Sequence, residues 1–335
     1  MARQAAAATS PGRRPSGWPG PAELPSTDRT RHAPAGKRTA REPVKAMART
    51  SGQPRERSAA PAEGAARRGE KLRVGICQIA LSDSARVAAR IASALQRLSD
   101  CEIVLLPEYA AHTTLAAEVL RAGRLRGRDH EHVASLIRAS AQADTVMSLA
   151  ERHDQAILFG CLDAENGRLV SRAVFLDPRT GVHLVCDKVH VHWTEGFLAP
   201  GEGLVPLKTR LGRIGVLICF DLAFWEAAHL LAERGADWLC VLSAVPREFD
   251  WRIVHRRAAG AAVFTQLPLA AACLGSSRLF PMGGHSAIFD HLGDRLATLG
   301  HARGGCCTAD LDLAAAAAWR EREPVARHRR PEIYQ

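Results

Sequence analysis

Three short apolar runs that each lead to a reactive side chain constrain this chain most strongly. Glu108, Lys188 and Cys219 each close, or closely follow, such a run. A short apolar run bounded by polar or turn residues predicts a buried strand. Strand ends that meet at one edge of a sheet can bring their side chains together. We therefore expect a carboxylate, an amine and a thiol to share one site.

The order of the predicted elements points to an α/β fold. Apolar runs alternate with segments of helical spacing, and Asp177-Pro178-Arg179-Thr180-Gly181 has the residues of a hairpin turn. Alternating strands and helices that also include hairpins predict mixed sheets. The predicted strands are 72–79, 102–106, 156–162, 169–176, 182–186, 204–207, 214–220, 238–242, 269–274, 286–290 and 308–311. The predicted helices are 82–98, 116–120, 131–152, 222–235 and 251–262.

Residues 1–70 differ in composition from the rest of the chain. They hold nine of the 18 prolines, and 14 Lys and Arg against 6 Asp and Glu, which gives this segment a net charge of +8 out of +10. Such a segment buries too little apolar surface to offset its ordering entropy. We expect a disordered basic extension over 1–70, or a start of translation further downstream, and one folded domain over 71–335. Nucleic-acid binding by the extension is the less favoured reading.

The cysteines and the lack of long apolar stretches suggest a compartment. The nine cysteines are odd in number, and most lie in apolar runs, as reduced core cysteines do. No apolar stretch reaches the ~18–20 residues of a membrane span, and the N-terminal segment has no apolar core of a secretory signal. We expect a cytoplasmic protein without membrane contact.

Cys219 is the candidate nucleophile. It ends one predicted strand and opens a helical segment, where backbone N–H groups favour negative charge. We therefore expect a lowered thiol pKa and a reactive thiolate. Glu108, if it faces Cys219, could take the thiol proton and return it to a leaving amine. The alternatives are an inert core cysteine and a solvated loop carboxylate.

Lys188 and Glu195 are candidates for electrostatic roles. An ammonium beside a thiolate and a developing oxyanion would stabilise both, although an isolated lysine is usually a surface charge. Glu195 lies seven residues after Lys188 and could orient it, hydrogen-bond the substrate, or be a plain loop acid. Trp193, Phe224 and Trp225 could line a pocket, but such aromatic residues more often belong to the core.

Metal and cofactor binding are not expected. The spacing of Cys186, His190 and His192 matches no standard zinc pattern, and Gly283-Gly284-His285 is neither a dinucleotide fingerprint nor a phosphate-binding loop. Cys306-Cys307 is better read as the start of a strand than as a redox pair. His285 is expected to be structural or to line a pocket.

Taken in order, these motifs resemble those of the nitrilase superfamily of carbon–nitrogen hydrolases over residues 71–335. Glu108 and Lys188 stand in segments similar to the family's glutamate and lysine motifs, and Cys219 in a segment similar to its cysteine elbow. The further similarities are Pro200-Gly201, Glu226, Gly284-His285-Ser286, Asp290, Gly293-Asp294 and residues 328–334.

The resemblance implies a four-layer αββα sandwich, often paired as a dimer. It also implies a catalytic triad of Glu108, Lys188 and Cys219 with Glu195 in support, and an oxyanion hole formed by the Phe220 backbone N–H and the Lys188 ammonium. Cys219 would attack an amide carbon, ammonia or an amine would leave, and water would hydrolyse the thioester.

The branch within the family is indicated by the residues around the cysteine. Cys219-Phe220-Asp221 resembles amidase and carbamoyl-hydrolase branches rather than nitrilases, which usually have Cys-Trp-Glu. Ala223 stands where some relatives have an arginine that holds a substrate carboxylate, although Arg247 or Arg278 could replace it. We expect a hydrolase of small amides, with N-carbamoyl amides and nitriles as alternative substrates.

A non-enzymatic scaffold or binding protein on the same fold is the alternative from another functional class. The complete set of Glu108, Lys188 and Cys219 argues against it. Iodoacetamide labelling separates the two, because a catalytic Cys219 should react faster than the other eight cysteines, whereas a scaffold should have no privileged thiol.

Overall fold

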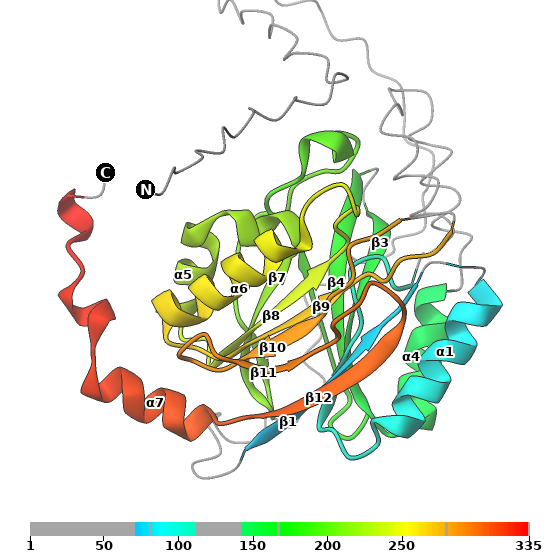
Figure 1. Ribbon diagram of the computed structural model, residues 1–335, viewed down its shortest axis with the longest axis horizontal. Coiled ribbons are helices and arrows are strands. Elements are labelled where there is room, and N and C mark those ends of the chain that lie inside the picture. The colour runs from blue at the N-terminus through cyan, green and yellow to red at the C-terminus, as the bar shows by residue number, and fades with distance from the viewer. Residues whose placement is uncertain are drawn as a thin grey trace, which may run out of the picture. The chain divides into compact units, whose positions relative to one another are not determined.

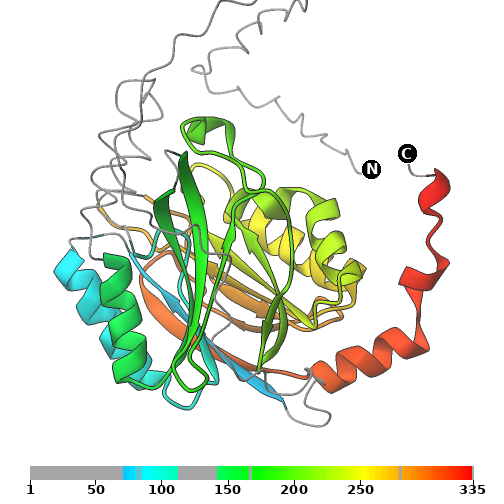
Figure 2. The same ribbon diagram turned by 180° about the vertical axis from the view of Figure 1, so that it is seen from behind.

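Two six-stranded mixed sheets, packed face to face, form the centre of the described chain. The structure, a computed structural model, describes residues 71–80, 82, 84–111, 142–165, 168–278 and 281–333. The expected extension over 1–70, the expected helix over 116–120 and the first part of the one over 131–152 lie outside these residues. The four layers can be followed from opposite sides in Figure 1 and Figure 2.

Each sheet has three parallel strands at its centre and antiparallel strands beside them. Sheet 1 has the order β12 (Gly305–Leu311), β1 (Leu72–Gln78), β2 (Ile103–Leu105), β3 (Ala156–Glu165), β4 (Arg168–Asp177) and β5 (Val182–Asp187). Sheet 2 has the order β11 (Arg295–Thr298), β10 (Ala287–Phe289), β9 (Leu269–Cys273), β8 (Trp238–Ser243), β7 (Gly212–Ile218) and β6 (Leu207–Thr209).

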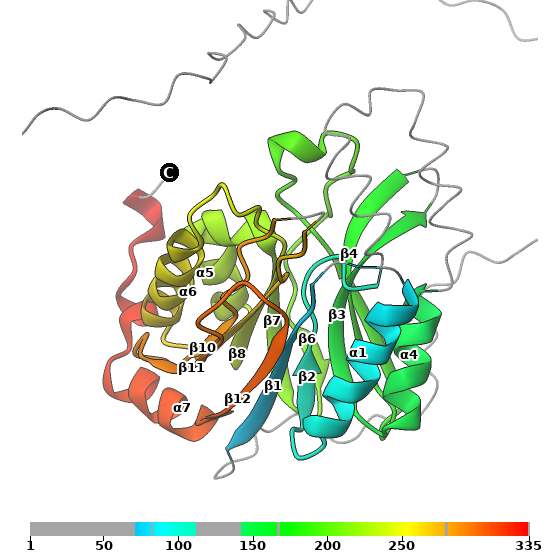
Figure 3. The same cartoon turned by 45° about the vertical axis from the view of Figure 1, so that its right-hand side comes forward.

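Helices cover the outer face of each sheet, as Figure 3 shows. Helices α1 (Ser84–Arg97) and α4 (Gln142–Arg152) cover sheet 1, and α5 (Trp225–Glu233) and α6 (Trp251–Thr265) cover sheet 2. A C-terminal segment follows with α7 (Leu313–Arg322) and the short 3₁₀ helices η3 (Val325–His328) and η4 (Pro331–Ile333). This arrangement confirms the predicted αββα sandwich.

Three apolar clusters correspond to the three interfaces between these layers. The central cluster joins inward-facing residues of both sheets, among them Phe175, Ile214 and Trp238. A second cluster lies between sheet 1 and its helices, and a third between sheet 2 and its helices. Strands that are covered on both faces must be apolar throughout, which explains why so many read as continuous apolar runs.

Several element boundaries differ from the prediction for identifiable reasons. The strand predicted over 204–207 begins only at Leu207, because Val205 points into solvent and Pro206 has no N–H for a ladder. The helix predicted from residue 222 begins at Trp225, after a separate 3₁₀ turn and an extended Phe224. Strand β11 and helix α7 were not predicted; α7 is an alanine-rich segment without an apolar stripe.

A close approach between β3 and the segment after β2 supports one part of the site. Gly160 in β3 lies so close to the segment after β2 that a Cβ there would be 2.5 Å from Glu108 Cα. The Gly160 N–H also donates to Pro107 O at 3.2 Å, and the Gly160 carbonyl accepts from Ala111 N–H. Glycine at this position therefore lets β3 support the backbone that carries Glu108.

Gly160→Ala should lower the free energy of unfolding by about 1–3 kcal/mol, the usual cost of overpacking. Urea unfolding measures this change. The matched control is Gly260→Ala in α6, where a Cβ would meet nothing within 4 Å and helix propensity favours alanine by about 0.5–1 kcal/mol. Equal stability of the two variants would show that the close approach at Gly160 is not important.

Candidate active site

The four predicted site side chains come from both sheets and meet between the strand ends. Glu108 follows β2 and Lys188 follows β5, both in sheet 1, whereas Cys219 follows β7 in sheet 2. Glu195 ends the short 3₁₀ helix η1 (Trp193–Glu195). Glu108 and Lys188 are each 1% exposed and Glu195 is 5% exposed, so these three charged groups are removed from bulk water.

A buried ammonium between two carboxylates is the centre of the site. Lys188 Nζ donates to Glu108 Oε1 at 2.9 Å and to Glu195 Oε2 at 2.7 Å. Burial alone would lower the pKa of Lys188, but the charges of Glu108 and Glu195, together with that of Cys219 when it is ionised, hold it above its ordinary value. The lysine is therefore a fixed positive charge and not a surface lysine.

Glu195 is the most strongly anchored of these groups. Its carboxylate also accepts from Tyr109 Oη at 2.5 Å and from the His192 backbone N–H at 3.2 Å. Burial acts to raise the pKa of Glu195, but the Lys188 ammonium and these hydrogen bonds hold it below its ordinary value. Of the two expected roles, orienting Lys188 agrees with this geometry.

Glu108 has one oxygen engaged and one available. Oε1 accepts from Lys188 and, at 3.4 Å, from Ser171 Oγ, whereas buried Oε2 accepts no hydrogen bond from the described residues. Burial raises the pKa of the Glu108 carboxyl; the Lys188 ammonium opposes this rise and the charge of Glu195 adds to it. A carboxylate with a free oxygen and a raised pKa is suited to accepting a proton.

Cys219 lies at a strained turn. Its φ of 48° is in the left-handed region, and it opens the 3₁₀ helix η2 (Cys219–Ala223) directly after β7. A strained backbone at a strand-to-helix turn is typical of functional sites, although strain alone does not establish one. Ser243 Oγ donates to Cys219 Sγ at 3.6 Å.

The expected lowering of the Cys219 pKa is wrong. Burial raises the pKa of the Cys219 thiol above its ordinary value, and the carboxylate of Glu108 raises it further, against the effect of the Lys188 ammonium. Burial and the two carboxylates outweigh the Lys188 ammonium and the hydrogen bond from the Ala244 backbone N–H, which lower the pKa. The raised pKa favours the neutral thiol over the thiolate in this site.

One of the two predicted oxyanion donors, the Phe220 backbone N–H, lies in this same segment, whereas Lys188 follows β5 in sheet 1. Phe220 is in the first turn of η2, whose N–H groups have no acceptor within the helix. Lys188 supplies the ammonium. Asp221 holds the turn in place, because its carboxylate accepts from the Ile218 N–H at 2.9 Å and from the His190 N–H at 2.7 Å.

An aromatic cluster lies beside the cysteine turn. His192 and Phe220 have ring centroids 4.9 Å apart, and Phe220 and Phe224 5.2 Å apart. The full aromatic cluster consists of His190, His192, Trp193, Phe220, Phe224 and Phe249. Trp193 and Trp225 are 69% and 60% exposed, so neither is the core residue that was favoured from the sequence.

Sequence reasoning missed several supporting residues. Tyr109 directly follows Glu108, is fully buried and has a φ of 61°, but no pattern distinguishes it from a core tyrosine. Ser171 and Ser243 belong to otherwise apolar strands. The only hint in the sequence was the presence of a polar serine in such a strand. The hydrogen bond from the His190 N–H to Asp221 likewise joins segments that are distant in sequence.

The histidines considered as metal ligands have other partners. His190 Nδ1 lies 2.8 Å from Asp221 Oδ1, and His192 Nδ1 lies 2.6 Å from Thr194 Oγ1. Within the residues that the structure describes, no group of three or more His, Cys, Asp or Glu side chains is arranged to hold a metal ion. Among the described helices, none is long and apolar enough to cross a membrane.

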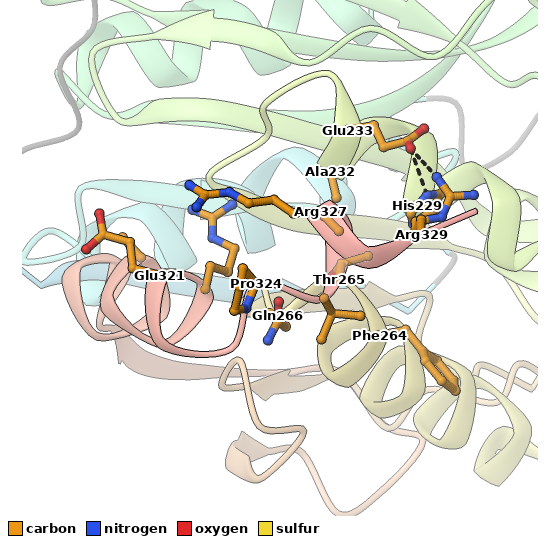
Figure 4. Close-up of a pocket in the computed structure, with 14 residues that line it drawn as sticks. His229, Ala232, Glu233, Phe264, Thr265, Gln266, Glu321, Pro324, Arg327 and Arg329 are labelled. Atoms are coloured by element: carbon orange, nitrogen blue, oxygen red, sulfur yellow. Dashed lines mark hydrogen bonds and ion pairs between the residues drawn. The ribbon is translucent and has the colours of Figure 1, made fainter. Parts of the chain in front are cut away.

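A groove of about 360 Å³ lies elsewhere, between α5, α6 and the C-terminal segment. Figure 4 shows Phe264, Gln266 and Pro324 along it, with Glu233 paired to His229 and Arg329 at one end. It contains none of the four predicted site residues. The groove therefore belongs to the outer surface of the helix layer.

Comparison with known proteins identifies the family. The family model described as Carbon-nitrogen hydrolase matches residues 73–321. The chain is 25% identical over 289 residues to the omega-amidase NIT3 of Saccharomyces cerevisiae, covering 79% of this chain and 95% of that protein. It is 26% identical over 309 residues to the deaminated glutathione amidase of Rattus norvegicus, covering 84% and 89%.

Solved structures agree with this fold. The crystal structure of S. cerevisiae Nit3, a member of branch 10 of the nitrilase superfamily, aligns with a TM-score of 0.63 and 22% identity over 78% of this chain and 97% of that chain. An amidase from Nesterenkonia sp. AN1, solved with an acetamide moiety added at its active-site cysteine, aligns with a TM-score of 0.63 and 19% identity over 80% and 100%. This chain therefore belongs to the carbon–nitrogen hydrolase family of the nitrilase superfamily.

Proposed function

We propose that this carbon–nitrogen hydrolase is an amidase that uses Cys219 as nucleophile, Glu108 as general base and acid, and Lys188 as the electrostatic member of a triad. The observation that carries the proposal is the buried Lys188 ammonium held between Glu108 and Glu195 beside the cysteine turn. This triplet is buried, where charged groups are costly unless they are paired. It provides the fixed charges that stabilise the oxyanion in acyl transfer.

In this mechanism Cys219 Sγ attacks the amide carbon while its proton passes to Glu108. The carbonyl oxygen becomes an oxyanion, which the Lys188 ammonium and the Phe220 N–H stabilise. Glu108 then protonates the leaving nitrogen, and ammonia departs from a thioester. Glu108 next takes a proton from water, which attacks the thioester and releases the acid and the thiol. The raised pKa of Cys219 agrees with proton transfer during attack rather than before it.

The substrate that we propose is a small linear primary amide. ω-Amides come first because relatives of this chain bear the names omega-amidase and deaminated glutathione amidase. Arg247 and Arg278, on the loops that follow β8 and β9, are exposed and could hold a substrate carboxylate in place of the arginine missing at Ala223. Ammonia release from a panel of ω-amides, N-carbamoyl compounds and nitriles tests this order of preference.

The context that we propose is a homo-oligomer in the cytoplasm. Trp225, Val263 and Phe264 are 60%, 48% and 78% exposed on the outer helices, and such apolar groups favour a protein interface. The nine cysteines, all free in this structure, agree with a reducing compartment.

Cys219→Ala should reduce turnover by at least ~10³-fold without changing the melting temperature by more than a few degrees, because a strand-end thiol contributes little packing. Cys219→Ser should be nearly as inactive, since a hydroxyl is the poorer nucleophile. Steady-state ammonia release measures both. Cys101→Ala, at a buried cysteine far from the site, is the control and should keep its kcat. Turnover by either Cys219 variant near the wild-type rate would refute the mechanism.

Lys188→Met should lower kcat by at least ~10²-fold, the usual loss for one oxyanion donor, with a smaller change in KM. Lys208→Met, at an exposed lysine of β6, is the matched control and should be silent. Removal of Lys188 also leaves two buried carboxylates uncompensated, which can destabilise the fold. The double variant Lys188→Met/Glu195→Gln removes one of these charges; it should recover stability but not kcat. Recovery of both would mean that Lys188 is structural only.

The acid limb of kcat/KM should lie above pH 4.5, the ordinary pKa of glutamate, because Glu108 must be ionised and its pKa is raised. Activity should fall as the pH falls through this value. Glu195→Gln removes a negative charge that raises the pKa of Glu108, so the limb should move to lower pH while kcat decreases. A purely structural Glu195 would leave the position of the limb unchanged.

Sedimentation velocity of the full chain should give a dimer or larger assembly at micromolar concentration. Phe264→Asp should shift the distribution towards monomer, because the charge would have to be buried in the interface. Val205→Asp, at an exposed valine on a loop before β6, is the control. Identical distributions for the two variants would place the interface elsewhere.

A further inference from the structure

A pair of cysteines outside the active site lies in direct register across two strands. Antiparallel strands β1 and β12 place Cys77 opposite Cys306. Residues directly opposite in an antiparallel pair have Cα atoms about 4.5–5.5 Å apart. Disulfides require about 4.4–6.8 Å between Cα atoms, so the register puts this pair within the backbone separation that a disulfide allows.

Both side chains lie on the outer face of sheet 1. Cys77 belongs to the cluster between sheet 1 and α1, and Cys306 packs against that same cluster. The next residue, Cys307, packs instead against the central cluster between the two sheets. Since successive side chains of a strand point to opposite faces, the sulfur partner of Cys306 is Cys77 and not its neighbour in sequence.

The surroundings of the two thiols are unequal. Cys77 is 4% exposed, whereas Cys306 is partly exposed on β12, the edge strand of sheet 1. Arg97, at the end of α1, has its Nη2 3.5 Å from Cys306 Sγ. A thiol beside a guanidinium at an accessible edge is in the kind of place where reactive cysteines occur.

The ionisation of the pair follows from these contacts. The hydrogen bond from Cys77 and the charge of Arg97 lower the pKa of Cys306 to about 7, against the effect of burial. The same hydrogen bond, together with burial, raises the pKa of Cys77 well above its ordinary value. These shifts favour the thiolate form at Cys306 and the thiol form at Cys77 near neutral pH.

We propose that Cys77 and Cys306 form a redox-active dithiol that reduces hydroperoxides, separate from the amidase site. The Cys306 thiolate attacks one oxygen of hydrogen peroxide, the O–O bond breaks, and a sulfenic acid and a hydroxide ion form. The Cys77 sulfur then attacks Cys306 Sγ; the S–O bond breaks, and the sulfenic hydroxyl leaves with the Cys77 proton as water. Two electrons pass from the sulfurs to the peroxide, which yields a Cys77–Cys306 disulfide, one water and one hydroxide ion.

The sequence alone does not indicate this pair. Cys306-Cys307 attracts attention as adjacent cysteines, whereas Cys77 lies more than two hundred residues away. The strand register shows that Cys306, and not Cys307, lies opposite Cys77. The pair also changes how the iodoacetamide test is interpreted, because Cys306 becomes a second cysteine that should react quickly. The labelled residue must therefore be identified by peptide mapping.

The test uses the full-length chain carrying Cys219→Ala, so that the active-site sulfur cannot exchange with the pair. The protein is treated with hydrogen peroxide, free thiols are blocked, and peptides are mapped by mass spectrometry without reduction. A Cys77–Cys306 linked peptide, 2 Da lighter than the sum of its reduced parts and restored by dithiothreitol, is the expected result. Cys306→Ser should abolish it, and Cys307→Ser is the matched control that should retain it.

Two further measurements keep the proposal open to refutation. In Cys77→Ser a Cys306 sulfenic acid should accumulate and be trapped by dimedone, because its resolving thiol is gone. The pH midpoint for alkylation of Cys306 should lie near 7 and move upward in Arg97→Gln. The proposal is overturned by a Cys306–Cys307 link, by Cys306 sulfinic acid without a disulfide, or by oxidation of Cys306 no faster than that of buried Cys101.

Discussion

The buried ion triplet of Glu108, Lys188 and Glu195 is the interaction on which the rest of the site depends. Two carboxylates could not be buried together without the ammonium between them, and the ammonium could not be buried without them. The triplet has a net charge of −1 when both carboxyls are ionised, and burial together with the charge of Glu108 raises the pKa of the neighbouring Cys219. The same three charges thus affect both the stability of the site and the ionisation of the thiol.

The order of strands and helices in the sequence was sufficient for an α/β fold with mixed sheets, whereas the four-layer sandwich and the triad were implied by the resemblance to carbon–nitrogen hydrolases. Glu108, Lys188 and Cys219 could be selected because each closes or closely follows an apolar run. In α/β folds, residues at the carboxyl ends of the strands often line a common site. Helix α7 could not be predicted, since an alanine-rich segment has no apolar stripe. Tyr109 and the direction of the Cys219 pKa could not be predicted either, because both depend on neighbours that are distant in sequence.

The two chemically distinct thiols illustrate how neighbours decide reactivity. Cys219 is buried next to a carboxylate, and its pKa is raised. Cys306 is partly exposed next to Arg97 and a hydrogen-bonding thiol, and its pKa is lowered. A count of cysteines, or their place in apolar runs, does not separate these cases. The two cases are distinguished by the strand register, which pairs Cys306 with Cys77, and by the charge of Arg97 at the end of α1.

Asp221 has a consequence for how the enzyme loses activity. Cys219, the proposed nucleophile, follows a strand of sheet 2, whereas Glu108 and Lys188 follow strands of sheet 1. The Asp221 carboxylate accepts from backbone N–H groups on both sides of this division, at Ile218 and His190. The catalytic geometry therefore depends on how one sheet is seated on the other. Conditions that let the sheets slide would separate the thiol from its base while each sheet kept its own hydrogen bonds. Heat inactivation would then precede unfolding, and an inactive protein could still have a native-like circular dichroism spectrum.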